Sequence, residues 1–91
     1  MKTVVKENAN GGKGQVVVKY ILDDNELNAK CKMFAEVTIA PGCSLGYHEH
    51  HGESETYYII KGQGEYDDNG TKRPVTVGDK TFTPDGRGHG I

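Results

Sequence analysis

The chain is a succession of short apolar stretches separated by glycine, asparagine and aspartate. The stretches are rich in β-branched and aromatic residues, as in residues 15–22 (QVVVKYIL) and 55–61 (ETYYIIK), and this composition favours strands. Residues that form turns interrupt the stretches repeatedly. The pattern predicts strands over residues 3–6, 15–22, 33–40, 46–50, 55–61, 63–66, 72–77 and 80–83.

The connections between these stretches also carry local signals. Asn69-Gly70 separates residues 63–66 from residues 72–77 and predicts an antiparallel hairpin. Residues 8–14 (NANGGKG) predict a loop, and residues 23–31 (DDNELNAKC) predict either a loop or a single helical turn. At least seven short strands with regular turn signals indicate an all-β fold, either a sandwich or a barrel.

Length and charge narrow the class of protein. The 91 residues have room for one core, so we expect a single domain spanning residues 1–91. The formal charge of −2 is spread over both signs without a basic run, which argues against nucleic acid as a partner. No apolar stretch approaches a membrane span, and residues 1–12 lack the apolar centre of a signal peptide. The sequence therefore predicts a cytoplasmic protein without a membrane partner.

The candidate chemistry lies in the second half of the chain. His48 and His50 are two positions apart, so on a strand they project from the same face and can chelate one ion. Glu55 starts the next predicted strand, and an antiparallel return would bring its carboxylate beside the imidazoles. Two histidines and a carboxylate are a ligand set of non-haem iron sites, with positions open to oxygen or substrate.

Neighbouring residues offer alternatives to this set. His51 adjoins the histidine pair, but alternation points it to the opposite face. Glu53 would replace Glu55 as the carboxylate ligand if the turn were shorter. We expect Glu49 and Glu53 to face solvent, and we prefer Glu55 as the ligand.

These residues resemble the two motifs of the cupin family. The first motif, G-x5-H-x-H-x3-4-E-x6-G, is filled over residues 42–62 by Gly42, His48, His50, Glu55 and Gly62. The second motif, G-x5-P-x-G-x2-H-x3-N, is filled over residues 78–91 except for its final asparagine. Its matching positions are Gly78, Pro84, Gly86 and His89.

The resemblance implies a small, antiparallel, jelly-roll-like β-barrel with a metal ion inside. His48, His50 and Glu55 from the first motif and His89 from the second are the implied ligands. One divalent transition metal is expected, and a site rich in histidine accepts iron, manganese, nickel, cobalt or zinc. Three neutral imidazoles and one carboxylate leave the ion a net positive charge, which favours a small anionic or chelating oxygen ligand.

Two further residues near the motifs, Tyr57 and Arg87, allow either a ligand-binding or a purely structural interpretation. The Tyr57 side chain shares a face with Glu55 and either touches a ligand or closes the core. Arg87 either meets an anionic substrate or faces water at a barrel rim. Cys31 and Cys43 have no CxxC spacing, so we expect buried or free thiols, with Cys43 structural. No catalytic base or nucleophile can be assigned.

The end of the second motif suggests an oligomer. The chain stops at Ile91, whereas cupin barrels continue with at least one more strand, so we expect a barrel that lacks its last strand. Unpaired edges recruit strands from another chain, and the expected result is a homodimer formed by strand pairing or exchange.

Three functions remain open at this stage. The first, which we prefer from the sequence, is a metal-dependent enzyme, an oxygenase, decarboxylase or isomerase, acting on a small oxygen-rich or anionic substrate. The second is a binding module of the same fold that captures a sugar or organic acid without turnover. The third is a structural role, in which the ion only braces two strands. The metal ligands and the fold do not determine which reaction is catalysed, because that depends on the other residues that line the pocket.

Overall fold

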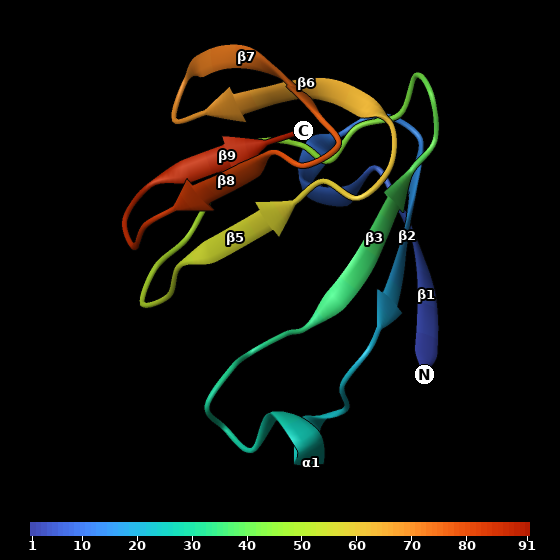
Figure 1. Cartoon of the computed structure of the whole chain (residues 1–91), viewed down its shortest axis with the longest axis vertical. Coiled ribbons are helices and arrows are strands. Elements are labelled where there is room, and N and C mark those ends of the chain that lie inside the picture. Colours follow the sequence, from blue (N-terminus) through green and yellow to red (C-terminus); the bar gives the residue numbers. More distant parts are fainter. The chain divides into compact units, whose positions relative to one another are not determined.

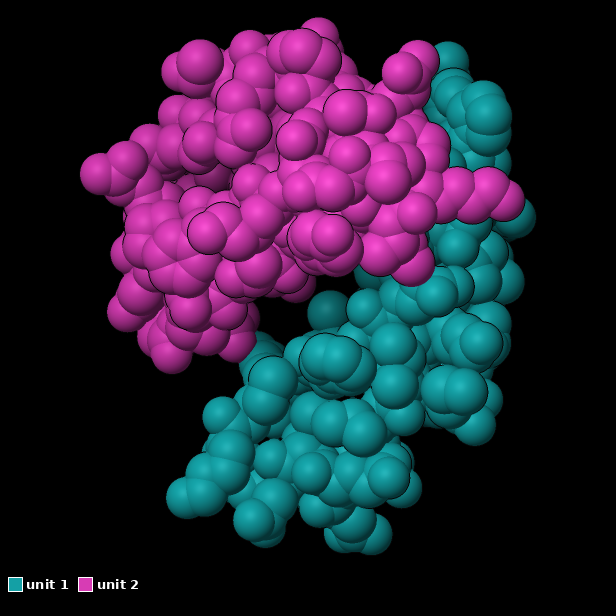
Figure 2. All heavy atoms as spheres, in the orientation of Figure 1, with its two compact units in different colours: residues 1–45 teal, residues 46–91 magenta.

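The computed structural model describes residues 1–91, which form two compact units, Met1–Leu45 and Gly46–Ile91 (Figure 2). The chain has nine strands and only short helical segments, and every strand pairing is antiparallel. The all-β prediction is therefore confirmed. No helix is long and apolar enough to span a membrane. The grouping of residues 1–91 into one domain stays a prediction.

The first unit is a three-stranded sheet in the order β1-β2-β3 (Figure 1). Val16 and Val18 alternate along the central strand and are both buried, as expected for the inward face of a strand. The strand bounds are Lys2–Glu7 for β1, Gln15–Tyr20 for β2 and Ala35–Ile39 for β3.

Two short helical segments connect these strands. Residues 23–31 adopt the single helical turn that the sequence left open, as α1 (Asp24–Leu27). Asp23 caps this turn by accepting a hydrogen bond from Glu26 N, and the Glu26 carboxylate accepts one from Asp23 N. Such a reciprocal capping box satisfies two backbone N–H groups that would otherwise lack partners. The predicted loop over residues 8–14 contains the 3-10 turn η1 (Ala9–Gly11).

The second unit contains two sheets (Figure 1). Four strands lie in the order β4-β9-β6-β7, and β5 pairs separately with β8. An antiparallel return after His50 would pair the strand that starts with Glu55 with the strand that carries His48. The structure differs, because β4 pairs with β9 and β5 pairs with β8. The bounds are His48–Glu49 (β4), Glu55–Tyr58 (β5), Gln63–Asp68 (β6), Thr71–Thr76 (β7), Lys80–Thr83 (β8) and Gly88–Gly90 (β9).

The predicted β6–β7 hairpin is confirmed and also supports β9. Its turn residues Asn69 and Gly70 both have positive φ, 51° and 97°, as a tight hairpin turn requires. Asn69 N donates to Gly88 O at 2.9 Å, and the Asn69 carboxamide oxygen accepts from Gly88 N at 3.4 Å. The turn thereby fixes the strand that carries His89.

The interior of the second unit is unusually polar. Thr81, Thr83 and His89 are as fully buried as Tyr66 and Val75, each at most 2% exposed. Buried polar groups cost free energy unless they form hydrogen bonds. This concentration of polar groups therefore marks the interior as more than a packing core.

Gly88 provides a test of how tightly β9 is held. A Cβ atom at this position would overlap the Tyr47 ring, whose Cε1 atom would lie 2.8 Å away. Because Tyr47 is 44% exposed and its ring can shift, we expect Gly88→Ala to lower the free energy of unfolding by about 1 kcal/mol, the low end of the cost of overpacking, in urea denaturation followed by circular dichroism.

Gly64 is the matched control, because it also lies in a strand but a Cβ there would meet only an Ile91 side-chain atom at 3.9 Å. Gly64→Ala should change stability much less, and Tyr47→Ala should relieve the Gly88→Ala defect. Equal stability of the two alanine variants would contradict the proposed overlap.

Candidate metal centre

Strand pairing brings the first and last predicted ligands together. In the β4–β9 pair, His48 lies directly opposite His89. His50 follows β4, and its backbone remains bonded to the turn before β9: His50 N donates to Arg87 O at 3.0 Å, and His50 O accepts from Gly86 N at 2.8 Å. This ladder keeps His48 and His50 on the same face, as the spacing predicts.

Four side chains converge on one point. One ligand atom from each of His48, His50, Glu55 and His89 lies within 4.8 Å of all the others. Glu55 Oε1 is 2.8 Å from His89 Nε2, 3.1 Å from His50 Nε2 and 4.0 Å from His48 Nε2. His89 Nε2 is also 3.0 Å from His50 Nε2 and 3.1 Å from His48 Nε2. All four residues were named from the sequence.

Hydrogen bonds on the far side of two rings determine which nitrogen faces this point. His48 Nδ1 lies 2.8 Å from Gly46 O, and His50 Nδ1 lies 3.4 Å from Glu53 Oε1. A carbonyl and a carboxylate can only accept, so in both histidines Nδ1 carries the hydrogen and donates. In the neutral rings, the Nε2 lone pairs of His48 and His50 therefore point into the cluster.

The electrostatics of the cluster call for positive charge. Burial alone would raise the pKa of Glu55, but the hydrogen bond from His89 and the attraction of the three histidines outweigh it and hold the pKa below its usual value. That attraction requires positive charge among the rings. Neutral imidazoles would instead present lone pairs about 3 Å from the ionised carboxylate and from one another, which repel unless a cation or a donor hydrogen lies among them. Three imidazoles and a carboxylate match the preferences of a divalent transition metal, so this donor set fits such an ion.

His89 is held differently from the other two histidines. It is fully buried, and its Nδ1 atom lies 2.9 Å from the Tyr66 hydroxyl and 2.8 Å from Thr83 Oγ1. These two hydroxyl oxygens are themselves 2.8 Å apart. The sequence did not identify Tyr66 or Thr83. Thr83 lies beside the cluster because β5 pairs with β8, which places Thr83 opposite Glu55, and no local pattern predicts that pairing.

Tyr57 lies at the edge of the cluster. Its ring stacks on the His89 ring with centroids 4.7 Å apart, and its hydroxyl is 3.3 Å from His89 Nε2. Burial raises the pKa of Tyr57, and the nearby Glu55 and Tyr66 raise it further. The hydroxyl therefore keeps its hydrogen at ordinary pH. Its contact with a ligand stays a prediction.

The other residues weighed from the sequence lie outside the cluster. The His51 side chain is 75% exposed and lies 3.7 Å from Glu49. Arg87 lies in the turn before β9 and is exposed, so its contact with a substrate also stays a prediction. Glu53 contacts the outer nitrogen of His50 and not the centre of the cluster.

Cys43 belongs to the first unit, where it packs against Gly14. A Cβ atom at Gly14 would run into the Cys43 sulfur. Both cysteines are free, and the Cys31 thiol donates to Met33 O at 3.2 Å. These contacts agree with a structural role for Cys43.

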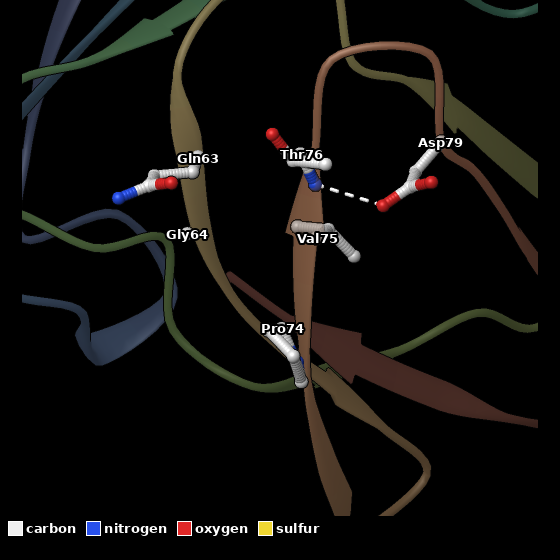
Figure 3. A pocket seen from close by; sticks show the side chains of 6 residues that line it. All are labelled: Gln63, Gly64, Pro74, Val75, Thr76 and Asp79. Atoms are coloured by element: carbon white, nitrogen blue, oxygen red, sulfur yellow. Dashed lines mark hydrogen bonds between the residues drawn. The ribbon is translucent and has the colours of Figure 1, made fainter.

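A separate hollow of about 640 Å³ lies along β6 and β7 (Figure 3). It shares no residue with the histidine cluster, and the carboxylate of Asp79 in its lining already accepts a hydrogen bond from Thr76 N at 2.8 Å. The cluster is the one place where three or more potential metal ligands converge. The lining residues are Gln63, Gly64, Pro74, Val75, Thr76 and Asp79.

Comparison with known proteins agrees with these motifs. Residues 35–91 match the family model described as Cupin domain. The chain is 42% identical over 84 residues to an oxalate-binding protein of Thermotoga maritima, covering 92% of this chain and 69% of that protein. It is also similar to the crystal structure of a predicted oxalate decarboxylase from T. maritima, with a TM-score of 0.94 and 38% identity, covering 99% of this chain and 78% of the other.

The ligand assignment predicts a specific pattern of metal loss. His48→Ala, His50→Ala and Glu55→Ala should each lower the metal content of the purified protein, because each removes one of the converging donors. His51→Ala should keep the metal content unchanged, since its exposed ring points elsewhere. Elemental analysis by plasma mass spectrometry measures the content. Equal loss in the His50 and His51 variants would overturn the assignment of faces.

Proposed function

Because the chain belongs to the Cupin domain family, we propose that it holds one divalent transition metal ion and uses it to bind a small oxygen-rich anion. The proposed ligands are His48, His50, Glu55 and His89. Iron, manganese, nickel, cobalt and zinc all suit this donor set. Oxalate is the first candidate anion, since one relative is an oxalate-binding protein and another is a predicted oxalate decarboxylase.

The convergence of four donor atoms within 4.8 Å carries this proposal. The set contains one carboxylate and three imidazoles, two of which have their hydrogen on the outer nitrogen. Such a set neutralises only one of the two charges of a divalent ion. The remaining positive charge lies in a partly buried site and favours an anionic ligand.

Tyr57 supplies a second point of recognition. Its hydroxyl keeps its hydrogen because burial and nearby groups raise its pKa, and it lies 3.3 Å from His89 Nε2 at the cluster. A protonated hydroxyl beside the ion donates a hydrogen bond to a carboxylate oxygen of the anion. Charge from the ion and direction from the hydroxyl would together select a small dicarboxylate.

Turnover is the second candidate, and the likeness to a predicted oxalate decarboxylase favours it. Decarboxylation of oxalate gives carbon dioxide and leaves a carbanion equivalent that must gain a proton to become formate. The relative that is 42% identical to this chain is an oxalate-binding protein. Binding without turnover is therefore our leading interpretation.

Calorimetry of the full chain loaded with Mn²⁺ tests this function. We expect oxalate to bind the loaded protein and not the Glu55→Ala variant. Tyr57→Phe should weaken oxalate binding about tenfold, the cost of one hydrogen bond to a charged group, and leave metal content unchanged. Tyr58→Phe is the matched control, because Tyr58 adjoins Tyr57 but is 65% exposed.

Two results would count against the proposal. Oxalate binding of equal strength to the loaded chain and to the Glu55→Ala variant would show that the cluster is not the binding site. No binding to the loaded chain would exclude oxalate as the anion. Formate and carbon dioxide released from the loaded chain would shift the assignment from a binding protein to a decarboxylase.

A homodimer remains part of the proposal. The two-stranded β5–β8 sheet carries Tyr58 and Phe82, which are 65% and 54% exposed. Exposed apolar strands tend to pair with other chains, so we expect a dimer in light scattering at micromolar concentration. Only monomer under these conditions would contradict the dimer. A cytoplasmic location stays a prediction of the sequence.

A further inference from the structure

The outer nitrogens of the three clustered histidines have partners of two different kinds. Those of His48 and His50 face a carbonyl and a carboxylate, which can only accept a hydrogen bond. That of His89 faces the hydroxyls of Tyr66 and Thr83, at 2.9 and 2.8 Å. A hydroxyl can either donate or accept, so this pair accommodates His89 with or without a hydrogen on Nδ1.

The inner nitrogen of His89 also has two possible roles. His89 Nε2 lies 2.8 Å from Glu55 Oε1 and 3.0 Å from His50 Nε2. A hydrogen on His89 Nε2 would satisfy the carboxylate while no ion is bound. A metal ion needs the lone pair at the same atom, and the hydrogen must then be on Nδ1.

We propose that the Tyr66–Thr83 hydroxyl pair lets His89 exchange tautomers when metal binds. Without metal, one hydroxyl donates to Nδ1, and Nε2–H donates to Glu55. With metal, Nδ1–H donates to Tyr66 or Thr83. In net, one proton moves from Nε2 to Nδ1 of the same ring, so His89 is neutral in both forms. This inference rests on the proposed metal site.

Burial makes the exchange depend on these two hydroxyls. His89 and Tyr66 are 0% exposed and Thr83 is 1% exposed, so solvent does not supply an alternative partner for Nδ1. A buried N–H without an acceptor is costly. Removing both hydroxyls would therefore destabilise the form of His89 that binds metal and lower the affinity for the ion. Tyr66 and Thr83 would contact His89 and not the ion, so they are positioning residues.

Imidazole ¹⁵N NMR of the full chain, without metal and with Zn²⁺, tests the exchange directly. We expect His89 to change from the Nε2–H to the Nδ1–H form, while His48 and His50 keep the Nδ1–H form throughout. The same tautomer of His89 in both samples would overturn the inference. If Zn²⁺ changed no histidine signal and did not bind in a competition assay, the proposed metal site itself would fail.

Variants separate positioning from general stability. The double variant Tyr66→Phe/Thr83→Val should bind Zn²⁺ about 10–100-fold more weakly, the usual effect of losing the partners of a ligating histidine. Each single variant keeps one hydroxyl and should lose less affinity. Thr83→Ser keeps both hydroxyls and should bind Zn²⁺ as tightly as the unaltered chain. Thermal unfolding without metal checks that each variant is folded.

Thr81 is the matched control. It lies on β8 two residues before Thr83, is equally buried at 1% exposed, and its hydroxyl has no hydrogen-bond partner. Thr81→Val should leave Zn²⁺ affinity and the His89 tautomers unchanged. Equal weakening by Thr81→Val and Thr83→Val would show a general packing effect and overturn the positioning role.

Discussion

The pairing of β4 with β9 is the constraint on which the candidate centre depends. It places His48 opposite His89, although these residues are far apart in the sequence. The same ladder continues through His50, whose backbone bonds to Gly86 and Arg87. The β6–β7 turn then holds β9 through Asn69. A three-residue strand is thus fixed from both sides, which a metal ligand needs if its nitrogen is to stay in place.

The sequence predicted correctly those strands and turns whose positions depend on residues close together in the chain. Asn69-Gly70 predicted the β6–β7 hairpin, and both residues adopt the positive φ that this turn needs. The bounds of β8 agree with the predicted residues 80–83. The strand predicted over residues 55–61 ends at Tyr58, because its partner β8 begins at Lys80 and Ile59 bonds instead to Gly78 and Asp79 in the turn before β8. Such bonds between separate segments have no local pattern.

The candidate centre was predictable for a different reason. Its four converging residues fall at fixed spacings in two motifs, so a resemblance was enough to name them. Tyr66 and Thr83 have no such spacing. Thr83 lies beside the centre because β5 pairs with β8, and the sequence suggested a different partner for β5. The four candidate metal ligands could be named from the sequence. Tyr66 and Thr83, which contact the outer nitrogen of His89, could not.

The polar interior of the second unit would link binding of the proposed metal to folding. A domain this small has little apolar surface to bury, and here fully buried positions are occupied by His89, Thr83 and Thr81. The convergence of Glu55 with three histidines adds repulsion that an ion would relieve. An ion that binds only the folded chain stabilises it in proportion to its affinity. The stability of the folded state would therefore depend on the concentration of the proposed metal.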